Sequence, residues 1–113
     1  MMRYGLSEQT IQKINSVFAR HPHVEKAVLY GSRAKGNYKP GSDIDLTLYG
    51  EEIPPEEKNR ILDELDDLDL PYVIDLSVFN HLTHAKLRDH IERVGLVFHQ
   101  RLDESPNERS QAG

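Results

Sequence analysis

Residues 31–45 read GSRAKGNYKPGSDID and lie between two segments that have the composition of β-strands. The preceding segment, residues 24–30, becomes continuously apolar towards its end, as expected for a strand covered on both faces. The following segment, residues 43–49, alternates between polar and aliphatic residues. Asn37, Pro40 and Gly41 predict a loop between the two. The pattern therefore predicts a strand, a Gly-Ser turn, a loop and a second strand.

Two acidic residues open the second predicted strand. Asp43 and Asp45 are two positions apart, so their side chains share one face of an extended chain, while Ile44 and the following leucines share the other. Two unit charges ~5 Å apart repel by ~3 kcal/mol at an effective dielectric constant of ~20. A shared proton or a bound cation relieves this repulsion. The alternative is a turn-forming acidic pair at the start of a strand.

A third acidic residue, Asp75, lies in a strand-like segment of residues 72–79. Strand periodicity places Asp75 on the face opposite to Ile74 and Leu76. If this strand lies beside residues 43–49 with the acidic faces aligned, three carboxylates converge. The alternative for Asp75 is a buried acid paired with a basic residue such as Arg88.

Three further segments have helical periodicity or helix-boundary residues. We expect helices over residues 8–20, with Ser7 as N-cap, over residues 55–69, and between a Thr83 cap and Gly95. A short edge strand follows at residues 96–98. The order predicts an α/β (α+β) fold, a small mixed β-sheet with helices packed against it. We expect one domain over residues 1–100 and a flexible C-terminal tail over residues 101–113.

The composition excludes several classes of protein. The chain has 113 residues, of which 37% are hydrophobic and 29% charged, and it contains no cysteine. Neither a disulfide framework nor a thiolate zinc site is therefore possible. No apolar run approaches the ~20 residues that span a bilayer, so we expect a cytoplasmic protein without membrane contact. The net charge of −5 argues against general nucleic-acid binding, which needs a basic surface.

The Gly31-Ser32 pair, a spacer of ten residues and the Asp43-Ile44-Asp45 triplet together resemble the signature of the polymerase beta nucleotidyltransferase superfamily. The Gly-Ser-Arg-Ala opening and the Ser-Asp-Ile-Asp-Leu close are most similar to the minimal nucleotidyltransferases, the short one-domain branch. The resemblance implies a polymerase-beta-like core. It also implies a reaction in which a nucleoside monophosphate moves from a triphosphate to an acceptor.

The resemblance also implies roles for individual residues. Asp43, Asp45 and Asp75 would be catalytic and would ligate two Mg²⁺ ions, which prefer carboxylate and phosphate oxygens. Asp75 would also help to deprotonate the acceptor hydroxyl. Gly31 would let the backbone approach the phosphates, and Ser32 would bond a terminal phosphate. Arg33 would contact the triphosphate or a partner protein.

The same resemblance implies a partner protein. A chain of this length has no room for a separate acceptor-binding domain, and minimal nucleotidyltransferases commonly pair with a helical HEPN protein, often an RNase toxin. The implied function is an antitoxin that adds AMP, from ATP, to that partner. The alternative is a nucleotide-binding module that neutralises a helical partner by complex formation without catalysis. Modification of RNA or of a small molecule is a third possibility.

Other residues allow a structural or a functional interpretation. Ser32 alone is also a typical helix cap, and Lys35 and Lys39 are typical of a solvated loop. His21 with His23, and His81 with His84, have spacings that occur in zinc sites, but no third ligand completes either pair. Tyr30 and Tyr49 either stack on a base or pack in the core, and we expect core packing.

Overall fold

The protein is described by a computed structural model that covers residues 2–101. Along the chain it contains β1 (Met2–Arg3), β2 (Leu6–Ser7), α1 (Glu8–Ala19), β3 (Lys26–Tyr30), α2 (Ser32–Lys35), β4 (Ile44–Tyr49), α3 (Pro55–Asp66), β5 (Ile74–Val78), a 3₁₀ turn η1 (Phe79–His81), α4 (Ala85–Val94) and β6 (Leu96–Gln100). The predicted tail lies outside the described residues, apart from Arg101. In the described part of the chain, no helix combines the length and the hydrophobicity needed to cross a bilayer.

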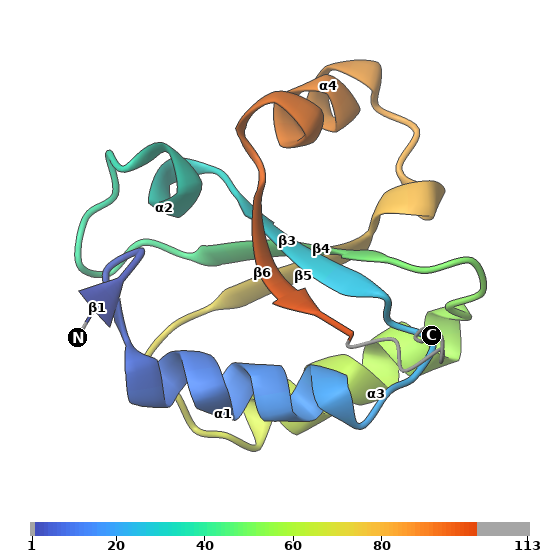
Figure 1. The fold of residues 1–113 in the computed structure, drawn as a ribbon, viewed down its shortest axis with the longest axis horizontal. Helices are drawn as coiled ribbons and strands as arrows, with labels where there is room; N and C mark the ends of the chain where they lie inside the picture. Colours follow the sequence, from blue (N-terminus) through green and yellow to red (C-terminus); the bar gives the residue numbers. More distant parts are fainter. Residues whose placement is uncertain (1, 102–113) are drawn as a thin grey trace, which may run out of the picture.

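Four strands form a mixed sheet in the order β5-β4-β3-β6. β3 pairs antiparallel with both β4 and β6, whereas β4 and β5 are parallel. Helices α1 and α3 cover one face of the sheet, and α4 covers part of the other (Figure 1). Helix α2 follows β3 directly at one end of the sheet (Figure 1). The mixed sheet with helices on its faces confirms the predicted fold class.

The larger core lies between the sheet and the helices α1 and α3. Ile44, Leu46 and Leu48 of β4 are fully buried in this core, which confirms the predicted aliphatic face of the strand. A smaller core of Val28, Tyr30, Phe79 and Ile91 lies on the α4 face. Because side chains alternate along a strand, Asp45 and Asp75 face the α4 side.

Helix α1 begins where its sequence predicts, ends one residue earlier, at Ala19, and buries the predicted face. The Ser7 hydroxyl accepts a hydrogen bond from the Thr10 amide at 3.1 Å, as expected of an N-cap. The apolar residues at helical spacing are all buried: Ile11, Ile14, Val17 and Phe18. This burial against the sheet stabilises the helix far more than helix propensity does.

Two predicted boundaries and one omission need correction. Helix α3 ends at Asp66 rather than at residue 69, because the Leu68 and Asp69 amides bond three residues back and Asp69 takes a left-handed φ of 57°. Helix α4 is capped by His84 rather than Thr83, since the His84 ring accepts the Leu87 amide at 3.2 Å. The hairpin of β1 and β2 was not predicted. It turns at Tyr4 and Gly5, both with positive φ, as in a two-residue hairpin loop.

Candidate active site

Three side chains stand in one row across the sheet. Asp45 of β4 is the register partner of Tyr30 on β3 and of Asp75 on β5. All three lie on the α4 face, so the strand pairing brings Asp45 and Asp75 side by side. Asp43 immediately precedes β4, two positions before Asp45, and its charge adds to the rise in the pKa of the Asp45 carboxyl. The structure therefore gathers the three predicted acids at one end of β4 and β5.

Electrostatic strain is concentrated on Asp45. Burial, the charge of Asp75 and the charge of Asp43 together raise the pKa of the Asp45 carboxyl from 3.8 to about 6. Asp45 is half-buried, whereas Asp43 and Asp75 are exposed. A cation that binds beside the half-buried Asp45 would relieve its repulsion with the two exposed carboxylates.

Gly31 brings the backbone against this carboxylate. Its φ is +76° and its ψ is −155°, a conformation that is essentially restricted to glycine. A β-carbon at this position would overlap Asp45 Oδ2. The close contact at Gly31 is therefore with the Asp45 side chain, and an approach of its backbone to phosphates stays a prediction.

Ser32 is the first residue of α2 and is half-exposed. Gly31 is the N-cap of this short helix, which has no side-chain capping bond, so Ser32 does not act as its cap. The Ser32 carbonyl accepts hydrogen bonds from the Gly36 and Asn37 amides at 2.9 and 3.2 Å. Its contact with a phosphate stays a prediction.

Arg33 is only 2% exposed, and its guanidinium bonds backbone carbonyls. It donates to the Ser42 carbonyl at 2.9 and 3.1 Å, to Pro40 at 3.2 Å and to Tyr4 at 2.8 Å. The rings of Tyr38 and Tyr72 lie 5.2 and 5.0 Å from it. Arg33 thus ties the loop before Asp43 to the N-terminal hairpin. A contact between Arg33 and nucleotide stays a prediction.

Arg88, the basic residue considered as a partner for Asp75, bonds backbone carbonyls instead. Arg88 donates to the carbonyls of Phe79 and Leu82 at 2.8 and 2.9 Å and lies 4.2 Å from the centre of the Phe79 ring. Arg88 therefore anchors η1 to α4. Asp75 keeps an exposed carboxylate on the face that Asp45 occupies.

The remaining candidate residues are exposed to solvent or make contacts within the fold. Lys35 and Lys39 are exposed. Tyr49 stacks on Phe79 with ring centres 4.6 Å apart, and Tyr30 meets His90 edge to face, so both tyrosines pack in the smaller core as predicted. His21 and His23 bond carboxylates of α3.

Two contacts near the site were not anticipated from the sequence. The Ser77 hydroxyl donates to the Thr47 hydroxyl at 2.9 Å in the row next to the acids, linking β5 to β4. Tyr30 lies beside the acids, and burial raises the pKa of its phenol, with Asp75 and Asp45 adding to the rise while Ser77 lowers it. Strand periodicity predicts that Asp45 and Thr47 share one face of β4 and that Asp75 and Ser77 share one face of β5. Only the register of the two strands shows which of these residues are neighbours.

The chemistry of the donor set fits a hard divalent cation. Carboxylate oxygens are the protein ligands that Mg²⁺ prefers, with phosphate oxygens and water completing its octahedron. Within residues 2–101, no three His, Cys, Asp or Glu side chains already surround a common point as metal ligands. The exposed carboxylates of Asp43 and Asp75 would therefore have to turn towards a cation beside Asp45.

Comparison with protein families matches residues 12–104 to the family described as polymerase beta, nucleotidyltransferase. No curated protein matches the sequence significantly. Among solved structures, a chain of a toxin–antitoxin complex with AMP-PNP has a TM-score of 0.63 at 20% identity, covering 91% of this chain and 79% of that one. A chain of the tri-AMPylated Shewanella oneidensis HEPN toxin in complex with MNT antitoxin has a TM-score of 0.60 at 17% identity, with coverages of 80% and 70%.

A third structure, the toxin–antitoxin complex MntA–HepT, has a TM-score of 0.60 at 17% identity and coverages of 81% and 71%. At these identities the likeness concerns the fold alone. The family match covers most of the chain and includes all six predicted site residues.

Proposed function

Because the chain belongs to the polymerase beta nucleotidyltransferase family, we propose that it transfers AMP from ATP to a hydroxyl group of a helical HEPN-type partner and thereby acts as an antitoxin. The family and the fold confirm the resemblance seen in the sequence. The observation that carries the proposal is the pairing of Asp45 with Asp75 in adjacent parallel strands. Solved complexes of HEPN toxins with MNT antitoxins contain the same fold, which supports the choice of partner.

Asp43, Asp45 and Asp75 are proposed as catalytic residues and as the ligands of Mg²⁺. Two bound Mg²⁺ ions would supply charge neutralisation at the triphosphate and a lower pKa for the acceptor hydroxyl. Members of this family generally use divalent metals. A nucleotide analogue, AMP-PNP, accompanies one of the complexes that share the fold. Gly31, Ser32 and Arg33 are the proposed nucleotide-binding residues.

The proposed reaction is an in-line displacement at the α-phosphorus of ATP. The acceptor oxygen forms a bond to this phosphorus, the bond to the oxygen that bridges to the β-phosphorus breaks, and pyrophosphate leaves. The hydroxyl proton passes to the Asp75 carboxylate and from there to water. Asp75 is suited to this step because its carboxylate is exposed and lies at the sheet edge, where a large acceptor can reach it.

A double substitution distinguishes AMP transfer to the partner from neutralisation of the partner by binding alone. Asp43→Asn with Asp45→Asn should abolish transfer of labelled AMP to a co-expressed partner, as followed by mass spectrometry of that partner. Arg93→Lys, on the exposed face of α4, is the matched control and should transfer normally. If the double variant still neutralises the partner fully, the chain acts as a binding module and the catalytic proposal is rejected.

Metal and nucleotide should bind together. ATP with Mg²⁺ should raise the melting temperature more than the sum of the separate effects, since the phosphates complete the metal coordination. The Asp43→Asn, Asp45→Asn variant should lose this joint effect. A thermal-shift titration in which wild type shows no joint effect would count against the metal site.

A further inference from the structure

Among residues 2–101, no strand pairs with the outer side of β5, which is called the free edge below. β5 is the terminal strand of the sheet, and its inner side pairs with β4. The Val73 carbonyl accepts the Ile44 amide at 2.9 Å, and in a parallel pair only alternate residues of a strand bond the same neighbour. The amide and carbonyl groups of Ile74 and Leu76 therefore point away from β4. Such a row of backbone groups can pair with another extended polypeptide.

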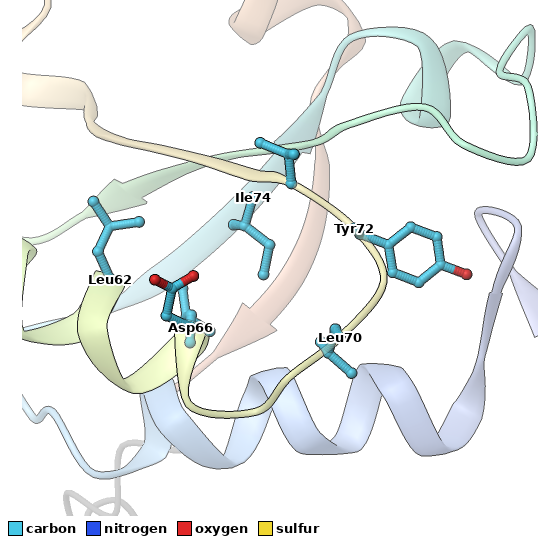
Figure 2. A pocket seen from close by; sticks show the side chains of 7 residues that line it. Leu62, Asp66, Leu70, Tyr72 and Ile74 are labelled. Atoms are coloured by element: carbon cyan, nitrogen blue, oxygen red, sulfur yellow. The ribbon is translucent and has the colours of Figure 1, made fainter.

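A cavity lined mainly by aliphatic side chains, with Asp66 and Tyr72 among them, opens beside the first residues of this strand. It has a volume of about 180 Å³ and lies between α3 and the segment that leads into β5. Figure 2 shows Leu62 and Asp66 of α3 on one side and Leu70, Tyr72 and Ile74 on the other. Unlike Leu76 and Val78, Ile74 is not fully buried, so the larger core is incompletely covered at this end of β5. An apolar cavity of roughly 150 Å³ holds a benzene ring, so this one has room for an aliphatic side chain.

The cavity and the acids lie on opposite faces of the same strand. Asp75 faces α4, whereas Ile74 faces α3 and lines the cavity. A strand added to the free edge would lie about 4.8 Å from β5 and would direct successive side chains to alternate faces. A residue opposite Asp75 would thus meet the acids, and its neighbour opposite Ile74 would meet the cavity.

We propose that the free edge of β5 binds an extended segment of the partner polypeptide, with the acceptor hydroxyl residue opposite Asp75 and an adjacent apolar residue in the cavity beside Ile74. This inference rests on the proposed function for the identity of the acceptor. The inference adds that the acceptor residue belongs to a strand paired with β5, and that the residue next to it places an apolar side chain in the cavity.

The charge around this edge indicates the character of the segment. Asp66 borders the cavity, the exposed acids Asp63, Asp67 and Asp69 are its close neighbours in the sequence, and the exposed Asp43 directly precedes β4. Val73, 66% exposed, lies at the entrance to β5. A segment with basic residues around its apolar and hydroxyl residues complements this surface, and the charges would steer it to the edge.

Two lysine-rich peptides of equal composition test the spacing. In the first, one leucine is adjacent to one tyrosine; in the second, the leucine is two positions away, so both side chains would need the same face. With ¹⁵N-labelled protein at millimolar peptide, the first should shift the amide signals of residues 72–78. With ATP and Mg²⁺ it should accept AMP about tenfold faster than the second, because only the first also buries its leucine.

Substitutions test the edge and the cavity separately. Ile74→Pro removes an outward amide while leaving the bonds to β4, and Leu70→Glu places a charge in the cavity wall. Each should weaken binding of the first peptide about tenfold. Val97→Glu on the other edge strand, β6, is the control, since Val97 is 50% exposed and lies far along the sheet order from β5. It should bind the peptide as wild type does.

The outcomes distinguish the two proposals. Binding of the first peptide at residues 72–78 without AMP transfer supports the edge as a binding surface and rejects the placement of the acceptor hydroxyl opposite Asp75, while the activity itself is judged on the co-expressed partner. Transfer that is equal for both peptides and unchanged by Ile74→Pro rejects the edge and leaves the activity intact. An absence of amide shifts at residues 72–78 overturns the inference.

Discussion

The α-carbon of Gly31 lies against the carboxylate of Asp45, so that a β-carbon at residue 31 would overlap Asp45 Oδ2. The last residue of β3 and the second residue of β4 are register partners, and Gly31 follows directly after this pair. Gly31 of the Gly-Ser turn thus contacts Asp45 of the acidic pair, although Asp45 lies 14 positions further along the chain. Residue 31 must therefore be glycine for Asp45 to keep its present position.

Gly31→Ala should disturb the site beyond the cost of its backbone strain. Gly36 is the internal control, since it also has a positive φ but has no atom within 4 Å of an added β-carbon. Gly36→Ala should cost about 1–2 kcal/mol of unfolding free energy. Gly31→Ala should cost more and should also reduce AMP transfer, because Asp45 has to move. Equal urea unfolding curves for the two variants would contradict this account.

Asp45→Asn should stabilise the protein at neutral pH. The pKa of Asp45 is raised to about 6, so the folded state binds a proton more tightly than the unfolded state, and stability falls as pH rises from about 4 to 6. Removing the charge should add about 1 kcal/mol at pH 7, because partial exposure screens the full effect. The gain should vanish below pH 4. Urea unfolding at both pH values measures it, with Asp63→Asn, at an exposed acid on α3, as control.

Arg33→Lys tests whether the buried arginine serves the fold or the nucleotide. A lysine cannot reproduce the fork that bonds the carbonyls of Tyr4, Pro40 and Ser42. We expect a loss of about 2–4 kcal/mol of unfolding free energy. If the role is structural, ATP affinity measured by calorimetry on the folded variant should change less than threefold, roughly 0.6 kcal/mol. A larger loss of affinity would place Arg33 at the nucleotide.

A carboxylate–histidine cluster joins the loop after α1 to α3. The ring nitrogens of His21 lie 3.0 Å from Glu57 and 3.0 Å from Glu64, and His23 lies 2.8 Å from the other Glu57 oxygen. Glu57 is 7% exposed. Its burial alone would raise its pKa, but the bonds from His23 and His21 outweigh burial and lower it below 4.5.

Glu57→Gln should therefore destabilise the protein in a pH-dependent way. A carboxyl whose folded-state pKa is lowered contributes stability above its unfolded value, here about 4.5, and loses it as pH falls through the folded-state value. The variant should lose about 1–2 kcal/mol at pH 6 and should match wild type at the acidic end. Glu56→Gln, exposed on the same turn, is the control. A difference from wild type that is constant with pH would contradict the ionic role.

Much of the fold follows from local patterns. The periodicity of Ile11, Ile14 and Val17 predicted the buried face of α1, and the alternation along residues 43–49 predicted which side of β4 enters the core. These features are local consequences of 3.6-residue and 2-residue periods. Helix ends were less predictable, since the end of α3 depends on the left-handed turn at Asp69 and the start of α4 on the His84 ring.

By itself, the sequence determined the family motif, the order of the elements that follow the N-terminal hairpin, and the face on which each acid lies. The tertiary structure alone decided that Asp45 and Asp75 are register partners, that Arg33 is buried among carbonyls, and that His21 meets a helix 36 residues further along the chain. The physical reason is that a periodic pattern specifies the face of a residue, whereas its neighbour across the sheet or between helices depends on long-range packing.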